Sequence, residues 1–219
     1  MRIAIIGTGT VGRTLARGLR RVGHDVVVGT RDPEETGRRE EWTDVGVPLM
    51  PLGTVAADAD LVLNATNGLA SLAALGEVGS DRLAGKVLVY VSNPLDFSQG
   101  FPPTLGVKDT DSLAEQIQRA FPEAQVVKSL NTVTASVMID PGSVGDGDTT
   151  IFAAGDDAQA RKQVVALLRE LGWKDIIELD GLQNARGLEM WLPLWVRLMA
   201  ALGTGEFNIK VVREGEIAQ

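Results

Sequence analysis

Apolar and polar positions alternate in blocks along the chain, and most blocks have the length of one strand or one helix. Residues 2–6 form a short apolar run, residues 13–22 repeat apolar positions at helical spacing, and residues 24–29 form a second, valine-rich run. This alternation continues to the C-terminal part of the sequence. It predicts an α/β fold in which a doubly wound parallel sheet carries helices on both faces.

The same pattern predicts the remaining elements and a two-part organisation. Further strands are expected at residues 47–50, 61–64, 86–91, 125–128, 149–154 and 175–179, and further helices at residues 34–42, 111–120, 156–171 and 184–202. The last helix is apolar nearly all round, and Pro193 is expected to kink it by removing a backbone donor. A Pro/Gly-rich stretch near residue 141 is the best candidate boundary between a domain of residues 1–141 and a small C-terminal α/β extension, residues 142–219, that ends in this apolar helix. The alternative is that this stretch is only a long turn.

A glycine-rich turn joins the first strand to the first helix. Its residues are Gly7, Thr8, Gly9, Thr10, Val11 and Gly12. Gly7 permits the turn, Gly9 lets the backbone approach a pyrophosphate, and Gly12 lets helix and strand pack closely. Because the strand before and the helix after are both present, the motif favours a Rossmann-type dinucleotide-binding domain over a structural turn.

The end of the second strand indicates which dinucleotide binds. Thr30 and Arg31 stand where an NAD enzyme usually has a carboxylate for the ribose diol. A hydroxyl beside a guanidinium suits the 2′-phosphate of NADP, and Arg38 and Arg39 add positive charge. The alternative is that Asp32 binds the ribose, but its place before a proline is typical of a helix N-cap. NADP(H) is therefore the expected cofactor.

Composition narrows the range of partners. The 219-residue chain has a net charge of −8, which argues against nucleic acid or an anionic membrane as a partner. It contains no cysteine, which excludes disulfides and zinc–thiolate sites, and no metal site is expected. No apolar run approaches the roughly 20 residues of a membrane span, and the chain opens with a strand rather than a signal peptide. We expect a cytoplasmic protein.

Small and mostly polar residues stand at the ends of three predicted strands. They are Asn64, Ala65 and Thr66, then Asn93 and Pro94, and finally Asn131. Such residues also serve turns and helix caps. Three such segments at one edge of a doubly wound sheet favour hydrogen bonds to the ribose and carboxamide of a nicotinamide.

Acid–base side chains are scarce at these strand ends. The only histidine, His24, lies on a helix-to-strand turn, and the only tyrosine, Tyr90, lies inside a predicted central strand. Reduction of a carbonyl needs a nearby proton donor, whereas hydride exchange between two bound cofactors needs only two rings held close together. The sequence thus predicts no catalytic side chain.

Several segments resemble the NADPH:F420 oxidoreductases over nearly the whole chain. They are GTGTVG at 7–12, VVGTRDP at 27–33, SNPLDFSQGFPP at 92–103, VKSLNTV at 127–133, AAGDD at 153–157 and ARGLEMWLPLW at 185–195. The segments at 91–93 and 127–133 are also similar to the reductase domain of STEAP metalloreductases. The resemblance implies hydride transfer between NADP(H) and the deazaflavin coenzyme F420. It also implies that residues 7–11 line the pyrophosphate, that Thr30 and Arg31 hold the 2′-phosphate, and that Asn64, Ala65, Asn93 and Pro94 flank the nicotinamide.

Other functions and partners stay open from the residues alone. The alternatives are an NADPH-dependent reductase of flavin or of a small imine or carbonyl substrate, and a non-catalytic NADP(H) sensor. Trp191 and Trp195 lie four residues apart in the apolar C-terminal helix, which favours a buried core or a homodimer interface over stacking on a ligand.

Overall fold

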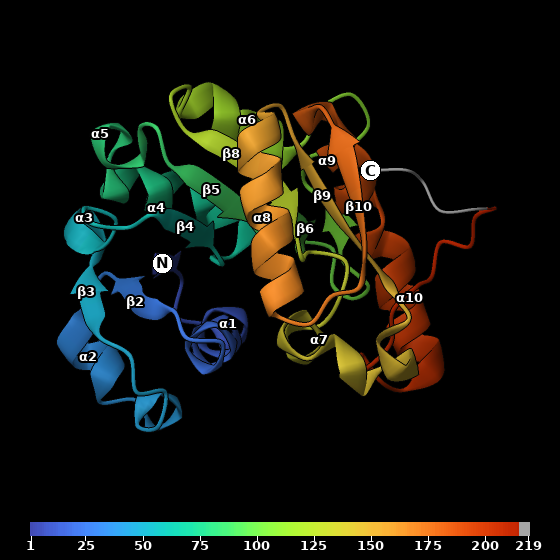
Figure 1. The fold of residues 1–219 in the computed structure, drawn as a ribbon, viewed down its shortest axis with the longest axis horizontal. Coiled ribbons are helices and arrows are strands. Elements are labelled where there is room, and N and C mark those ends of the chain that lie inside the picture. The colour runs from blue at the N-terminus through green and yellow to red at the C-terminus, as the bar shows by residue number, and fades with distance from the viewer. Residues whose placement is uncertain (215–219) are drawn as a thin grey trace.

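One eight-stranded sheet forms the centre of the molecule (Figure 1). The computed structural model describes residues 1–214. Across the sheet the strands are β10 (Asp175–Asp180), β9 (Thr150–Gly155), β8 (Gln125–Ser129), β5 (Val87–Tyr90), β4 (Leu61–Asn64), β1 (Arg2–Ile6), β2 (Asp25–Thr30) and β3 (Leu49–Pro51). Neighbouring strands are parallel except for β8 and β9. The expected doubly wound α/β fold is confirmed, with one antiparallel pair added.

Helices cover both faces of the sheet. One face packs against α1 (Thr10–Arg21), α7 (Ala135–Ile139) and α8 (Ala158–Glu170), and the other against α3 (Leu52–Val55), α4 (Ser71–Val78), α5 (Ser80–Leu83), α6 (Leu113–Ala120) and α9 (Ala185–Met190). Alternate residues of β1 enter the two cores, since Ile3 and Ile5 belong to one and Ala4 and Ile6 to the other. A strand buried on both faces reads as the continuous apolar run seen in the sequence.

Two expected helices are interrupted. In place of the polar helix expected at 34–42, the structure has a short helix, α2 (Pro33–Gly37), followed by a separate 3₁₀ turn (Glu40–Trp42). This break turns the buried Trp42 inward, where its indole N–H donates to the Thr8 carbonyl at 3.3 Å. The helix expected at 184–202 divides at Trp191 into α9 and α10 (Leu192–Leu202), because Pro193 supplies no N–H to continue the first helix.

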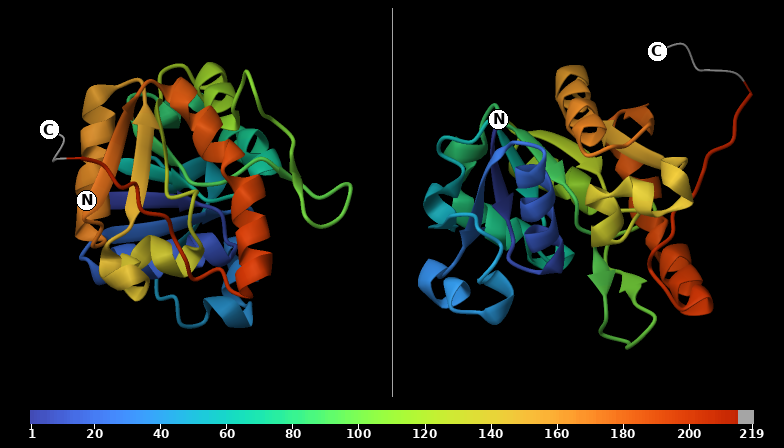
Figure 2. Two further views of the ribbon diagram at one scale, coloured as in Figure 1. Left: turned by 90° about the vertical axis from the view of Figure 1, so that its right-hand side faces the viewer. Right: turned by 60° about the horizontal axis from the view of Figure 1, so that its bottom comes forward.

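Two segments beyond the main sheet lie near its carboxyl-terminal edge. A hairpin of β6 (Leu95–Asp96) and β7 (Thr104–Leu105) extends away from the body, as Figure 2 shows. After α10, residues 203–214 run back along the molecule, where the Thr150 N–H donates to the Ile209 carbonyl at 2.9 Å. No helix within residues 1–214 is long and apolar enough to cross a bilayer.

The predicted boundary at 141/142 falls between β8 and β9, within one continuous sheet. The chain leaves β8, forms α7 at that end of the sheet, and enters β9 from the same end, so β9 runs antiparallel. The last residues of the predicted extension, 215–219, lie outside the described residues.

Candidate functional site

The glycine turn has the geometry that its sequence predicts. Gly7 has a positive φ of 122°, and a Cβ there would lie 2.6 Å from the Ala65 carbonyl oxygen. A Cβ on Gly12 would lie 2.0 Å from the Gly7 carbonyl oxygen. A Cβ on Gly9 would meet nothing within 4 Å. The tight turn at Gly7 and the close packing at Gly12 are confirmed, and Gly9 faces open space at the start of α1.

The first N–H groups of α1 are free to bind an anion. Gly9 is the N-cap of this helix and supplies no side-chain acceptor, and no acidic residue occupies the first turn. The helix N-terminus carries a partial positive charge from its aligned peptide dipoles. Thr8, Thr10 and Val11 surround this end, and Thr10 and Val11 also line the cavity described below.

The end of β2 separates a buried hydroxyl from an exposed cation. Thr30 is buried, and its hydroxyl lies 2.7 Å from that of Thr36. Arg31 is exposed, and none of the ion pairs found within residues 1–214 includes it. Asp32 is the N-cap of α2, where its carboxylate accepts from the Glu35 N–H at 2.9 Å. The N-cap interpretation of Asp32 is therefore confirmed.

The two arginines farther along this segment are paired with helix neighbours. Arg38 lies 3.2 Å from Glu34 and Arg39 lies 2.7 Å from Glu35, and both pairs are exposed. These pairs neutralise much of the positive charge that the two arginines add near β2. Arg31 has no such ion-pair partner within residues 1–214.

A cavity of about 360 Å³ lies beyond the carboxyl ends of the central strands, beside the glycine turn. Its lining residues are Thr10, Val11, Ala65, Thr66, Asn67, Gly68, Val91, Ser92, Asn93, Leu95, Phe97, Asn131, Val133, Thr134, Ala135, Met138, Leu192 and Trp195. Among these described residues there is no Asp, Glu, His, Lys, Arg or Tyr. The cavity thus offers apolar walls and neutral hydrogen-bonding groups.

Two asparagines form the polar wall of the cavity. The Asn131 amide nitrogen donates to the Asn93 side-chain oxygen at 2.9 Å and to the Leu188 carbonyl at 2.8 Å. The Asn93 amide nitrogen donates to the Asn131 carbonyl at 3.0 Å. The Asn131 side-chain oxygen is buried and has no hydrogen-bond partner within residues 1–214.

Asn64 and Pro94 lie beside the cavity and shape its wall. Asn64 is fully buried, and its side-chain oxygen accepts from the Thr66 N–H at 3.2 Å and from the Thr66 hydroxyl at 2.7 Å. The buried Pro94 accepts from the Gly106 N–H at 2.8 Å, which closes the β6–β7 hairpin. Both residues hold neighbours that face the cavity, namely Ala65, Thr66 and Asn93.

Aromatic side chains far apart in the sequence complete the cavity. Phe97 comes from the β6–β7 hairpin and is 55% exposed. Trp195 comes from α10, and its ring stacks on Phe207 of the C-terminal segment with centroids 5.4 Å apart. Trp191 instead points to the interior, donating to the Thr132 carbonyl at 3.3 Å. Sequence reasoning did not assign Phe97 to the site and favoured a core or interface place for Trp195.

A buried ion pair behind the cavity was not expected from the sequence. Lys128 on β8 and Glu189 on α9 are 0% and 1% exposed, and their charged groups lie 3.7 Å apart. Burial lowers the pKa of Lys128 to about 8 and raises the pKa of Glu189. A lone lysine in an apolar strand and a lone glutamate in an apolar helix were the available signals, since buried charges are nearly always paired.

The single histidine and the single tyrosine of the chain lie away from the cavity lining. His24 lies 2.7 Å from Glu170, near the start of β2, as its expected structural role requires. Tyr90 is fully buried in β5, and the Lys128 ammonium lies 3.9 Å from the centre of its ring. Burial strongly raises the pKa of the Tyr90 phenol, so it stays protonated.

Comparison with known proteins identifies the family. Residues 2–94 match the family model for NADP oxidoreductases, coenzyme F420-dependent. The chain superposes on the crystal structure of a candidate F420-dependent NADP reductase from Arthrobacter sp. FB24 with a TM-score of 0.94 and 52% identity, covering 97% of this chain and 100% of that one.

Two curated relatives extend the comparison. The chain is 28% identical over 209 residues to the F420-dependent NADP reductase of Methanothermobacter marburgensis, covering 90% of this chain and 92% of that protein. It is 29% identical over 207 residues to metalloreductase STEAP3 of Rattus norvegicus, covering 92% of this chain but only 39% of that longer protein. The match at 52% identity over the full length of the Arthrobacter protein, together with the family model, shows that the chain belongs to the family of coenzyme F420-dependent NADP oxidoreductases.

Proposed function

We propose that this protein transfers a hydride between NADP(H) and coenzyme F420. The observation that carries the proposal is the cavity beside the glycine turn, with aromatic and aliphatic walls, asparagine amides and no titratable lining residue. When bound, the two coenzymes supply the redox chemistry: one hydride, carrying its electron pair, passes between nicotinamide and deazaflavin, and water supplies or accepts the accompanying proton. The protein would then have to hold the two rings face to face.

We propose the following contacts for NADP(H). The pyrophosphate lies on Gly7, Thr8, Gly9, Thr10, Val11 and Gly12, the 2′-phosphate on Thr30 and Arg31, and the nicotinamide beside Asn64, Ala65, Thr66, Asn93, Pro94 and Asn131. The open space at Gly9, the start of α1 without a side-chain cap and the exposed Arg31 support the first two contacts. Asn93 and Asn131 in the cavity wall support the third, since side-chain amides can donate to and accept from a carboxamide.

The second ring fits the apolar side of the cavity. Phe97 and Trp195 offer flat faces, and Leu192 and Met138 fill the remaining wall. Leu192 and Trp195 come from the predicted C-terminal extension, whereas Thr10 and Val11 come from the predicted N-terminal domain. This supports the proposed division into residues 1–141, which hold NADP(H), and residues 142–219, which complete the second-substrate site.

A steady-state assay tests the proposed reaction. The purified protein is mixed with NADPH and oxidised F420 under anaerobic conditions, and loss of the deazaflavin absorbance is followed; parallel reactions contain FMN or a cyclic imine. We expect rapid turnover when F420 is the acceptor and no turnover with FMN or the imine. Turnover only with FMN or the imine contradicts the proposal in favour of another reductase. Tight NADPH binding without turnover on any acceptor indicates a sensor.

We also propose a cytoplasmic homodimer whose interface includes α10. Leu194 and Leu202 on this helix are 50% and 58% exposed, and Met190 on α9 is 39% exposed. Large apolar side chains gathered on neighbouring helices are typical of an interface. Light scattering after gel filtration measures the mass in solution. A monomeric mass at micromolar concentration contradicts the dimer. The cytoplasmic location follows from the need for NADPH and is checked by cell fractionation.

A further inference from the structure

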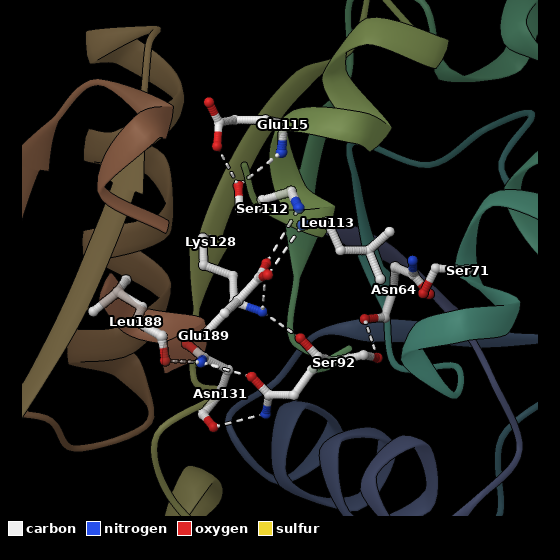
Figure 3. Close-up of polar contacts among 12 residues, drawn as sticks. Asn64, Ser71, Ser92, Ser112, Leu113, Glu115, Lys128, Asn131, Leu188 and Glu189 are labelled. Atoms are coloured by element: carbon white, nitrogen blue, oxygen red, sulfur yellow. Dashed lines mark hydrogen bonds and ion pairs between the residues drawn. The ribbon is translucent and has the colours of Figure 1, made fainter. Parts of the chain in front are cut away.

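The buried pair of Lys128 and Glu189 lies one layer behind the cavity and is not required by the redox chemistry itself. Both side chains are almost completely shielded from water, and neither lines the cavity. Figure 3 shows the charged ends of Lys128 and Glu189 turned toward each other. Removing two charges from water is costly, and an apolar pair of similar volume is often at least as stable. A pair that is costly for stability suggests a task in the site that it adjoins.

Lys128 is connected directly to the cavity wall. Its ammonium donates to the carbonyl of Ser92, and it rests 3.9 Å from the centre of the Tyr90 ring. Ser92 lines the cavity, and the next residue is Asn93, whose amide contacts Asn131. The lysine therefore holds the peptide that aims the Asn93 side chain.

Glu189 is connected to the same wall from the opposite side. The carbonyl of the preceding residue, Leu188, accepts from the Asn131 amide at 2.8 Å. The Glu189 carboxylate accepts from the Leu113 and Ala114 N–H groups at 3.0 and 3.2 Å, at the start of α6. These two donors hold the carboxylate in one orientation, and with it the turn of α9 that carries Leu188.

We propose that Lys128 and Glu189 form a positioning pair that sets Asn93 and Asn131 toward the nicotinamide. The inference rests on the proposed function, because it assigns the nicotinamide to these amides. The ion pair joins β8 to α9 at one point. Asn131, just after β8, joins the same two elements through Leu188, and its bond to Asn93 adds the segment that follows β5. A small displacement of a group that positions the nicotinamide lowers the rate of hydride transfer steeply. A fixed ion pair behind the two amides would limit such displacement.

A second ion pair supplies a matched control. Arg186 on α9 and Glu115 on α6 form two hydrogen bonds of 2.6 and 2.9 Å, so they also join α9 to α6. Neither residue contacts Ser92, Asn93 or Asn131 in any hydrogen bond found within residues 1–214. Arg186→Met therefore loosens the attachment of α9 while leaving the contacts behind the amides in place.

The test compares ligand binding and turnover in four variants. They are Lys128→Met, Glu189→Gln, the double variant, and Arg186→Met as the control. Calorimetry gives the Kd of NADPH and of 2′-phospho-ADP-ribose, which lacks only the nicotinamide. Their ratio isolates the contribution of the nicotinamide. The kcat with F420 is measured separately, and thermal melting establishes that each variant is folded at the assay temperature.

In Lys128→Met we expect the affinity advantage of NADPH over 2′-phospho-ADP-ribose to fall about tenfold or more, with kcat reduced at least as much. Binding of 2′-phospho-ADP-ribose by Lys128→Met should stay close to wild type. In Arg186→Met, both the affinity ratio and kcat should stay close to wild type. Equal losses in Arg186→Met overturn the inference, since docking of α9 then explains them. A wild-type ratio in the folded double variant also overturns it, and this variant keeps the test open if a single variant is unstable. Failure of the wild type to reduce F420 would refute the proposed function, while the binding ratio would still test the positioning pair.

Discussion

Replacing Gly9 by valine separates ligand binding from folding. Gly9 has φ −73° and ψ −175°, which is extended backbone that valine adopts readily. A Cβ at this position meets no protein atom within 4 Å, and the residue is exposed. The free energy of unfolding of Gly9→Val should therefore stay within about 0.5 kcal/mol of wild type.

The same side chain should prevent NADPH from binding. It would occupy the space where the pyrophosphate approaches the uncapped start of α1. Hydrogen bonds to a charged group contribute about 1.5–3 kcal/mol each. Loss of two such bonds weakens binding by at least about 3 kcal/mol, which is more than about a hundredfold in Kd.

Calorimetric titration with NADPH and thermal melting measure the two quantities on one sample. Gly12→Ala is the matched comparison, because its Cβ would lie 2.0 Å from the Gly7 carbonyl oxygen. We expect this second variant to melt well below wild type, whereas Gly9→Val should not. Binding of NADPH by Gly9→Val with the wild-type Kd would refute the assignment of the pyrophosphate to this turn.

Three further predictions follow from single side chains. Arg31→Ala should weaken NADPH binding by about 1.5–3 kcal/mol and leave NADH binding unchanged by calorimetry, and equal losses for both cofactors would contradict its 2′-phosphate role. His24→Asn should keep most of kcat between about pH 5.5 and 8, because His24 pairs with Glu170 away from the cavity lining, whereas a loss of more than about a hundredfold would indicate an acid–base role. Burial lowers the pKa of Lys128 from 10.5 to about 8. Between these two pKa values the unfolded chain therefore binds more protons than the folded chain, so the free energy of unfolding should rise with pH. Urea unfolding should show this rise in the wild type but not in the double variant Lys128→Met/Glu189→Gln. No such rise would mean that Lys128 keeps its ordinary pKa.

Local sequence patterns were sufficient for the strands and the nucleotide turn. The apolar run at residues 2–6 is β1 with the predicted bounds, and the three glycines beyond it lie where a strand-to-helix turn needs them. Each of these features depends on contacts between near neighbours in the chain. The backbone conformation of Gly7 and the close packing of Gly12 leave few alternatives to glycine, so the motif can be read directly.

Helix ends and strand direction were less accessible. The apolar periodicity at 184–202 continues through Trp191 although the helix divides there, and Pro193 was the only local sign of the division. Nothing in the residues of β9 marks it as antiparallel to β8. The direction of a strand depends on the end at which the connection enters the sheet, and that is a property of the whole chain path.

The sequence by itself therefore determined the α/β class, the dinucleotide turn, the candidate amides at three strand ends and the scarcity of acid–base groups among them. Only the tertiary structure decided that Phe97 and Trp195 share one cavity and that Lys128 meets Glu189 behind it. The physical reason is the range of the contacts involved. Turns and strands depend on residues a few positions apart, whereas a cavity wall or a buried ion pair depends on which distant segments the packed sheet and helices bring together.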